Sequence, residues 1–131
     1  MLAHDRVHDG SVLTEALLAV FRSDPRDVVE FTTTATPGDF GGFAPMVFEY
    51  AAKGDAVAER ILKRAVDDIE KSLAVLGLRP GDALCLLGGL APLIESRLSP
   101  KYRVLTRPPL QDALGGAVAM AARLFAGVNP A

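Results

Sequence analysis

A continuous apolar run followed at once by two glycines is the sequence feature that most constrains the fold of this chain. Residues 83–87 are Ala-Leu-Cys-Leu-Leu, and Gly88 and Gly89 come directly after them. An apolar run of this length with no polar side predicts a strand that is buried on both faces, as in a parallel sheet. We expect a second short strand at 102–105, joined to the first by a right-handed crossover through a helix at about 92–98.

The remainder of the chain has the spacing of amphipathic helices, with recognisable start and stop residues. The strongest helix is expected from Asp55, as the N-cap, to Gly77, because its apolar residues form one stripe. Two further helices are expected at 12–22 after Ser11 and at 25–31 after Asp24, the second of them weakened by Thr32–Thr34. Two more are expected at 40–53, which follows Asp39 and ends at Gly54, and at 113–125 after Asp112.

Composition places these elements in a folded domain and excludes several classes of protein. The chain has 131 residues, of which 50% are hydrophobic and 23% charged, and this balance excludes a disordered segment. We predict a helix-rich α/β protein with a single domain over 1–131, made of a helical part at 11–77 and a small parallel β-α-β-α unit at 83–125. The one cysteine, Cys85, excludes a disulfide framework and is expected to be packed inside the first strand.

Charge and hydropathy limit the possible partners. The net charge of −2 excludes a strongly basic nucleic-acid binder, and no apolar stretch reaches 18 residues, so neither a nucleic acid nor a membrane is predicted as a partner. No signal peptide is recognised, and a cytoplasmic location is predicted. The basic excess falls in the C-terminal part, which either favours an anionic ligand there or is ordinary variation on a solvated surface. These residues are Arg79, Arg97, Lys101, Arg103, Arg107 and Arg123.

The Gly-Gly step between a strand and a helix is the pattern that carries most functional information. Glycines at this position let a nucleoside or phosphate lie against the backbone, where a side chain would clash, and free amides at a helix start favour anions. The alternative is a plain tight turn. The sequence around Gly88 and Gly89 is neither a Walker A loop nor the GxGxxG dinucleotide fingerprint.

Two further patterns have structural interpretations that outweigh the functional ones. Residues 38–41 contain Asp-Phe-Gly, as in the magnesium-binding segment of protein kinases, but no other kinase motif accompanies it, so Asp39 is interpreted as a helix cap. His4 and His8 are spaced to hold a metal on one helix face, yet no third ligand is near, and no metal site is predicted. No general base can be assigned from spacing, so no catalytic residue is predicted.

The motifs occur in an order that resembles the C-terminal part of the BadF/BadG/BcrA/BcrD-type ATPase family, which includes glucosamine and N-acetylglucosamine kinases. The resemblance covers nearly the whole chain. It rests on the ordered motifs Asp9-Gly10, Leu13-Thr14-Glu15-Ala16, Asp39-Phe40, Ala44-Pro45-Met46-Val47, Ala51 to Ala58, Leu86 to Ala91 and Pro108 to Ala117.

The resemblance implies an actin-like ATPase fold, in which two ribonuclease-H-like lobes enclose ATP and Mg²⁺, with this chain forming part of the second lobe. It also implies that Gly88, Gly89, Leu90 and Ala91 form the adenosine motif. Gly115 and Gly116 are implied to be cofactor-binding residues in a terminal Asp-Ala-Leu-Gly-Gly-Ala motif. Only one cysteine is present, which favours the sugar-kinase branch over the iron–sulfur activator branch.

The family motifs that are missing from this sequence determine which activity we expect. The family's phosphate loop, catalytic carboxylate and most sugar contacts belong to the first lobe, and none is present in these 131 residues. The resemblance therefore implies the nucleotide-binding portion of an ATP-dependent amino-sugar kinase that is inactive alone. The alternative is a non-catalytic binding or interaction module. In either case an unpaired edge at 83–87 would be covered by its own helices, or by a second copy or a missing N-terminal lobe.

Overall fold

The computed structural model describes residues 10–126, and this part of the chain consists of helices, turns and one isolated β-bridge. The chain divides into two compact units, Met1–Leu76 and Gly77–Ala131. The predicted single domain over 1–131, with a helical part at 11–77 and a smaller part at 83–125, stays a prediction. No helix in the described residues is long and apolar enough to cross a membrane.

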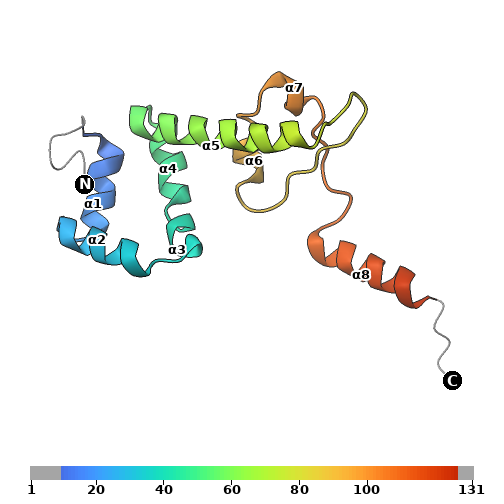
Figure 1. Cartoon of the computed structure of the whole chain (residues 1–131), viewed down its shortest axis with the longest axis horizontal. Helices are drawn as coiled ribbons and strands as arrows, with labels where there is room; N and C mark the ends of the chain where they lie inside the picture. Colours follow the sequence, from blue (N-terminus) through green and yellow to red (C-terminus); the bar gives the residue numbers. More distant parts are fainter. Residues whose placement is uncertain (1–9, 127–131) are drawn as a thin grey trace. The chain divides into compact units, whose positions relative to one another are not determined.

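In the described residues the first unit contains five helices, and four of them begin after a residue whose side chain caps the helix. They are α1 (Val12–Val20), α2 (Pro25–Thr34), α3 (Pro37–Gly41), α4 (Ala44–Ala52) and α5 (Ala56–Val75) (Figure 1). Ser11 forms a capping box with Thr14 at the start of α1. Asp24 accepts the backbone N–H of Arg26 at 2.9 Å, and Asp55 caps α5. These three predicted N-caps are confirmed.

Two expectations for residues 32–53 are wrong. The threonines do not end α2, which continues through Thr34; the hydroxyls of Thr32 and Thr33 donate to backbone carbonyls three residues earlier. The single helix expected after Asp39 is two helices, α3 and α4. Thr36 is the N-cap of α3, and Asp39 is the third residue of its capping box, where its carboxylate accepts the Thr36 N–H at 2.7 Å.

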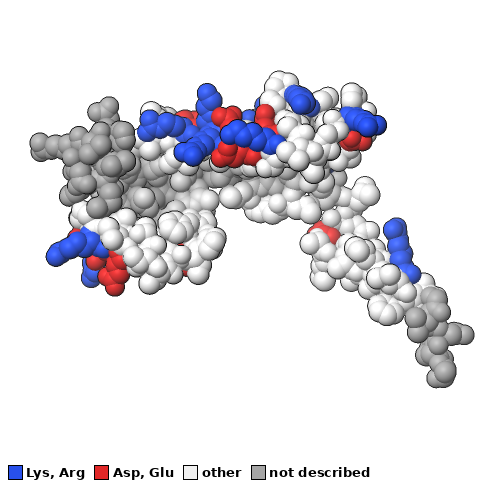
Figure 2. Space-filling view, in the orientation of Figure 1, with Lys and Arg blue, Asp and Glu red and all other residues white. Residues whose placement is uncertain are grey.

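The core of the first unit lies where α1, α4 and α5 pack together. Leu13, Ala51, Ala58 and Leu62 are buried there, with partly buried neighbours from α4. The apolar stripe expected along α5 is buried at four positions, of which Ala58 and Leu62 belong to this core, but the Ile61 side chain on the same stripe is 45% exposed. Figure 2 shows the opposite character along the outer face of α5, where basic and acidic side chains alternate.

The second unit contains α6 (Ala91–Glu95), α7 (Pro100–Arg103) and α8 (Ala113–Phe125). The two predicted strands are wrong as extended elements. Residues 102–105 lie in α7 and the turn after it, and within 83–87 only Leu84 pairs with another segment, through a parallel bridge to Thr106. The N–H of Leu84 donates to the carbonyl of Leu105 at 2.8 Å, and the N–H of Arg107 donates to the carbonyl of Leu84 at 2.9 Å.

The physical reasons for this difference are local. Pro100 favours a helical turn at its position, and this turn includes two of the residues expected in the second strand. A parallel pair without a third strand is also too small a sheet to extend. Cys85 is exposed and Leu87 is 65% exposed, so the run 83–87 is not buried on both faces. The expectation that Cys85 is packed inside a buried strand is therefore wrong.

Candidate functional site

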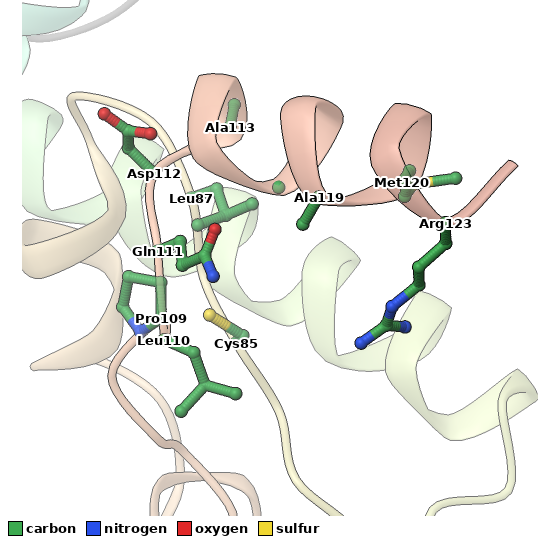
Figure 3. A pocket seen from close by; sticks show the side chains of 11 residues that line it. Cys85, Leu87, Pro109, Leu110, Gln111, Asp112, Ala113, Ala119, Met120 and Arg123 are labelled. Atoms are coloured by element: carbon green, nitrogen blue, oxygen red, sulfur yellow. The ribbon is translucent and has the colours of Figure 1, made fainter. Parts of the chain in front are cut away.

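The second unit contains a cavity of about 420 Å³ between α8 and the end of the apolar run (Figure 3). It is lined by Cys85 and Leu87, by residues 109–113, and by Gly116, Ala119, Met120 and Arg123 of α8. This size falls in the range of small-molecule sites, which extends from roughly 300 to 1,000 Å³. Since all lining residues belong to the second unit, the cavity is a feature of that unit alone.

The lining is mostly apolar, with a few polar groups at separate points. Asp112 is engaged as the N-cap of α8, because its Oδ1 accepts the N–H of Gly115 at 2.7 Å. The side chains of Gln111 and Arg123 carry the other strong hydrogen-bonding groups of the lining, and the thiol of Cys85 is a weak one. An apolar cavity with a few placed polar groups is the usual composition of a small-molecule or cofactor site.

The two glycines of α8, Gly115 and Gly116, have different neighbours. Gly116 lines the cavity, where the absence of a side chain leaves the surface of α8 accessible. Gly115 does not line it. A Cβ built on Gly115 would lie 2.9 Å from Oε1 and 3.3 Å from Cβ of Gln111, so Gly115 leaves room for that side chain. The two residues predicted together therefore have different surroundings.

The predicted adenosine motif, 88–91, begins immediately after a lining residue, Leu87, but is not itself part of the lining. Gly88 has φ +101°, a conformation that residues with a side chain rarely adopt, and a Cβ on Gly88 or Gly89 would meet no atom within 4 Å. The carbonyl of Gly88 accepts the N–H of Ala91 at 3.1 Å, which closes the turn into α6. The role of residues 88–91 in binding remains a prediction.

Part of the basic excess of the C-terminal region is used within the chain. Arg103 donates to the carbonyls of Leu98 at 2.6 Å and Ser96 at 3.1 Å. Arg107 donates to the carbonyls of two residues in the preceding turn. Of the six basic residues, Arg123 is the one that lines the cavity. The other five basic residues therefore lie outside the lining of this cavity.

The other motifs singled out by the sequence do not form a site in the described residues. Asp39 takes part in the capping box of α3 as its third helical residue and not as the N-cap, and no group of three metal-ligating side chains occurs between residues 10 and 126. His4 and His8 lie outside the described residues. Sequence reasoning missed Gln111 and Arg123 as cavity residues. Gln111 lies four positions before Gly115, a spacing that could have indicated contact with that glycine.

Comparison with known proteins gives two matches that cover nearly all of this chain, and no family model matches it. The sequence is 33% identical over 127 residues to glucosamine kinase GspK of Vibrio cholerae, covering 97% of this chain and 42% of that protein. The structure matches a crystal structure from Chromobacterium violaceum that carries the provisional name N-acetylglucosamine kinase, with a TM-score of 0.80 and 29% identity. That match covers 91% of this chain and 41% of the other.

The chain thus spans about two fifths of the length of each protein it matches. The agreement of sequence and fold over the same long stretch confirms the resemblance that the ordered motifs indicate. The helix-rich character expected for the chain is also confirmed, whereas its small parallel sheet is not. By sequence and by fold, nearly the whole of this chain is similar to part of proteins named glucosamine kinase and N-acetylglucosamine kinase.

Proposed function

We propose that these 131 residues form the nucleotide-binding portion of an ATP-dependent amino-sugar kinase, within the second lobe of an actin-like ATPase fold. The observation that carries the proposal is the match over nearly the whole chain to kinases named for glucosamine and N-acetylglucosamine. The substrate of the whole enzyme would accordingly be an amino sugar.

The cavity in the second unit fits the nucleoside part of ATP. Its apolar lining suits the faces of a purine ring, and Gln111 and Arg123 supply hydrogen-bonding groups at its border. Leu87 leads directly into Gly88 and Gly89, whose open backbone leaves space for a ligand. We assign Mg²⁺ no ligands on this chain. In the whole enzyme, bound ATP and Mg²⁺ would supply the phosphoryl group and its charge neutralisation.

These residues contribute binding and orientation of the nucleotide rather than a catalytic step. The sequence contains neither the phosphate-loop motif nor a recognisable catalytic carboxylate, so we expect no sugar phosphorylation by the 131 residues alone. Calorimetry with MgATP tests the binding part, and an assay for ADP formation with glucosamine or N-acetylglucosamine tests the second part. Absence of ATP binding would overturn the nucleotide role, and sugar-dependent turnover by this chain would overturn its inactivity.

A matched pair of variants locates the binding. Ala119 lines the cavity, whereas Ala117 lies on the same helix outside the lining and is exposed. Ala119→Phe should fill part of the cavity and reduce ATP affinity at least tenfold, while Ala117→Phe should bind ATP as the unchanged chain does. Equal affinities of the two variants would place the nucleotide elsewhere.

A second candidate is a non-catalytic module that associates with itself, and the exposed apolar side chains of α8 favour it. Leu114, Val118 and Phe125 are each at least 60% exposed, and Leu110 before the helix is fully exposed. Light scattering over a range of concentrations tests this candidate. Val118→Glu should disperse an assembly formed through α8, whereas Val75→Glu, at an exposed valine of the first unit, should not. A monomer at all concentrations would reject it.

A further inference from the structure

The cavity offers a candidate for the recognition of the base, and this inference rests on the proposed nucleotide binding. We propose that the carboxamide of Gln111 is the group that selects adenine over guanine, and that Gly115 is a positioning residue for it. Gln111 comes from the turn before α8 and its side chain extends into the cavity, beside Leu87 and Cys85 (Figure 3).

The position of the Gln111 side chain depends on Gly115. The nearest atom to a Cβ on Gly115 would be Oε1 of Gln111 at 2.9 Å, and Oδ1 of Asp112 would follow at 3.1 Å. Contacts under 3.0 Å require something to move, so any side chain at Gly115 would displace the carboxamide. Asp112 is held by its hydrogen bond to the Gly115 N–H, and the flexible Gln111 head is therefore the group that would shift.

The chemistry of a carboxamide matches one purine better than the other. A glutamine head presents one acceptor and one donor side by side, and this pair complements the N6 amino group and N7 of adenine. The corresponding edge of guanine has two acceptors, O6 and N7, which suit arginine or lysine. Leu87, Ala119 and Met120 supply apolar contacts that do not distinguish the two rings.

Arg123 also lines the cavity. If Arg123 contacted the base instead of Gln111, the cavity would prefer guanine to adenine. Its guanidinium carries donors only, so it would favour guanine or an anionic group. Gln111 stands in the segment that enters α8, whereas Arg123 stands near the other end of the helix, so a ligand can contact the two groups at different points (Figure 3). The two assignments predict opposite nucleotide preferences.

The experiment is calorimetric titration of the 131-residue chain with ATP, GTP and adenosine. We expect the unchanged chain to bind ATP more tightly than GTP by at least tenfold, and to retain adenosine binding. Gln111→Leu should lower ATP affinity about tenfold and bring the ATP-to-GTP ratio close to one, because one bidentate contact gives discrimination of this order. Gly115→Ala should lower the same ratio while changing thermal stability little, because the flexible Gln111 head has to move most and the Asp112 carboxylate only by a few tenths of an ångström.

Controls separate this inference from the proposed function. Gly41→Ala adds the same methyl group within a helix of the first unit, where nothing lies within 4 Å, and it should leave the nucleotide ratio unchanged. If the unchanged chain binds neither nucleotide, the proposed function fails and the inference with it. If ATP binds but the ratio is the same in Gln111→Leu, only the inference is overturned. A preference for GTP that is lost in Arg123→Leu would assign base recognition to Arg123 instead.

Discussion

The carboxylate of Asp55 connects the starts of two helices that are 42 residues apart in the sequence, because its Oδ2 accepts the backbone N–H of Leu13 at 3.0 Å. Its other oxygen accepts the N–H groups of Val57 and Ala58, each at 2.9 Å, in the first turn of α5. One side chain thus satisfies free donors at the start of α5 and joins α5 to α1. Leu13 is itself a buried core residue, so this connection also sets how α1 enters the core.

Asp55→Ala should destabilise the first unit more than an ordinary surface substitution. The change leaves the amide of Leu13 and two amides of α5 without their acceptor, and we expect the melting temperature of the first unit to fall by about 5 °C. Circular dichroism during heating measures this. Asp67→Ala removes an aspartate from the exposed face of the same helix and should have little effect. An equal loss in both variants would contradict the role of Asp55.

Stability should fall as the pH decreases below about 4. Hydrogen bonds from the Ala58 and Leu13 amides lower the pKa of Asp55 below its ordinary value of 3.8. The side chain and backbone N–H of Arg26 lower the pKa of Asp24 to about 2. A carboxyl whose pKa is lowered by folding stabilises the folded state above its unfolded pKa, and this contribution is lost as the pH falls through the folded pKa.

The measurement for this pH dependence is the urea midpoint between pH 6 and pH 2. Asp24→Asn should show a weaker decrease across this interval than the unchanged chain, because one carboxyl no longer binds a proton on unfolding. Asp67→Asn, at an exposed aspartate of α5, serves as the comparison. Identical pH profiles for Asp24→Asn and the unchanged chain would show that the contact with Arg26 does not contribute.

The phenylalanine cluster of the first unit should depend mainly on Phe31. Its ring lies 5.2 Å from that of Phe21, 5.3 Å from Phe40 and 5.7 Å from Phe43, with tilted or edge-on geometry. Phe31→Ala should reduce the free energy of unfolding by about 2–3 kcal/mol, below the range for a fully buried ring because Phe31 is partly exposed. Phe125→Ala, at a 67% exposed ring, should change it by less than about 0.5 kcal/mol.

Hydrogen exchange can test the isolated bridge of the second unit. The amides of Leu84 and Arg107 donate across the bridge and should exchange more slowly than those of neighbouring residues. A complete strand over 83–87 would also protect the amide of Leu86, because alternate residues of a strand pair with the same neighbour. Protection at Leu86 in the isolated chain would show that the sheet extends beyond the single bridge.

The accuracy of the sequence predictions differed between helices and strands. Ser11, Asp24, Asp55 and Asp112 were predicted as N-caps, and each one accepts a backbone N–H at its helix start. A cap depends on residues within one turn, so the sequence contains the information for it. The strands at 83–87 and 102–105 require partners that are distant in sequence, and a run of apolar residues does not reveal whether those partners are present.

For the candidate site, too, the sequence indicated some residues and not others. The resemblance implied that Gly115 and Gly116 bind the cofactor, and of these two Gly116 lines a cavity together with Leu87, whereas their role in binding stays a prediction. The sequence did not indicate that the side chain of Gln111 would lie against Gly115, since this contact depends on the path of the chain between Pro109 and α8. The placement of residues 88–91 in the site was implied by the resemblance and stays a prediction.

The sequence by itself indicated most of the longer helices, the caps at their starts and the similarity to amino-sugar kinases, because these follow from local hydrogen bonding, periodic burial and ordered motifs. Only the tertiary structure decided that Leu84 makes a single bridge, that Cys85 is exposed, and that Gln111, Gly116 and Arg123 border one cavity. The physical reason is that burial and pairing depend on which distant segments approach one another. The residues next to a given residue in the sequence do not show which distant segments will pack against it.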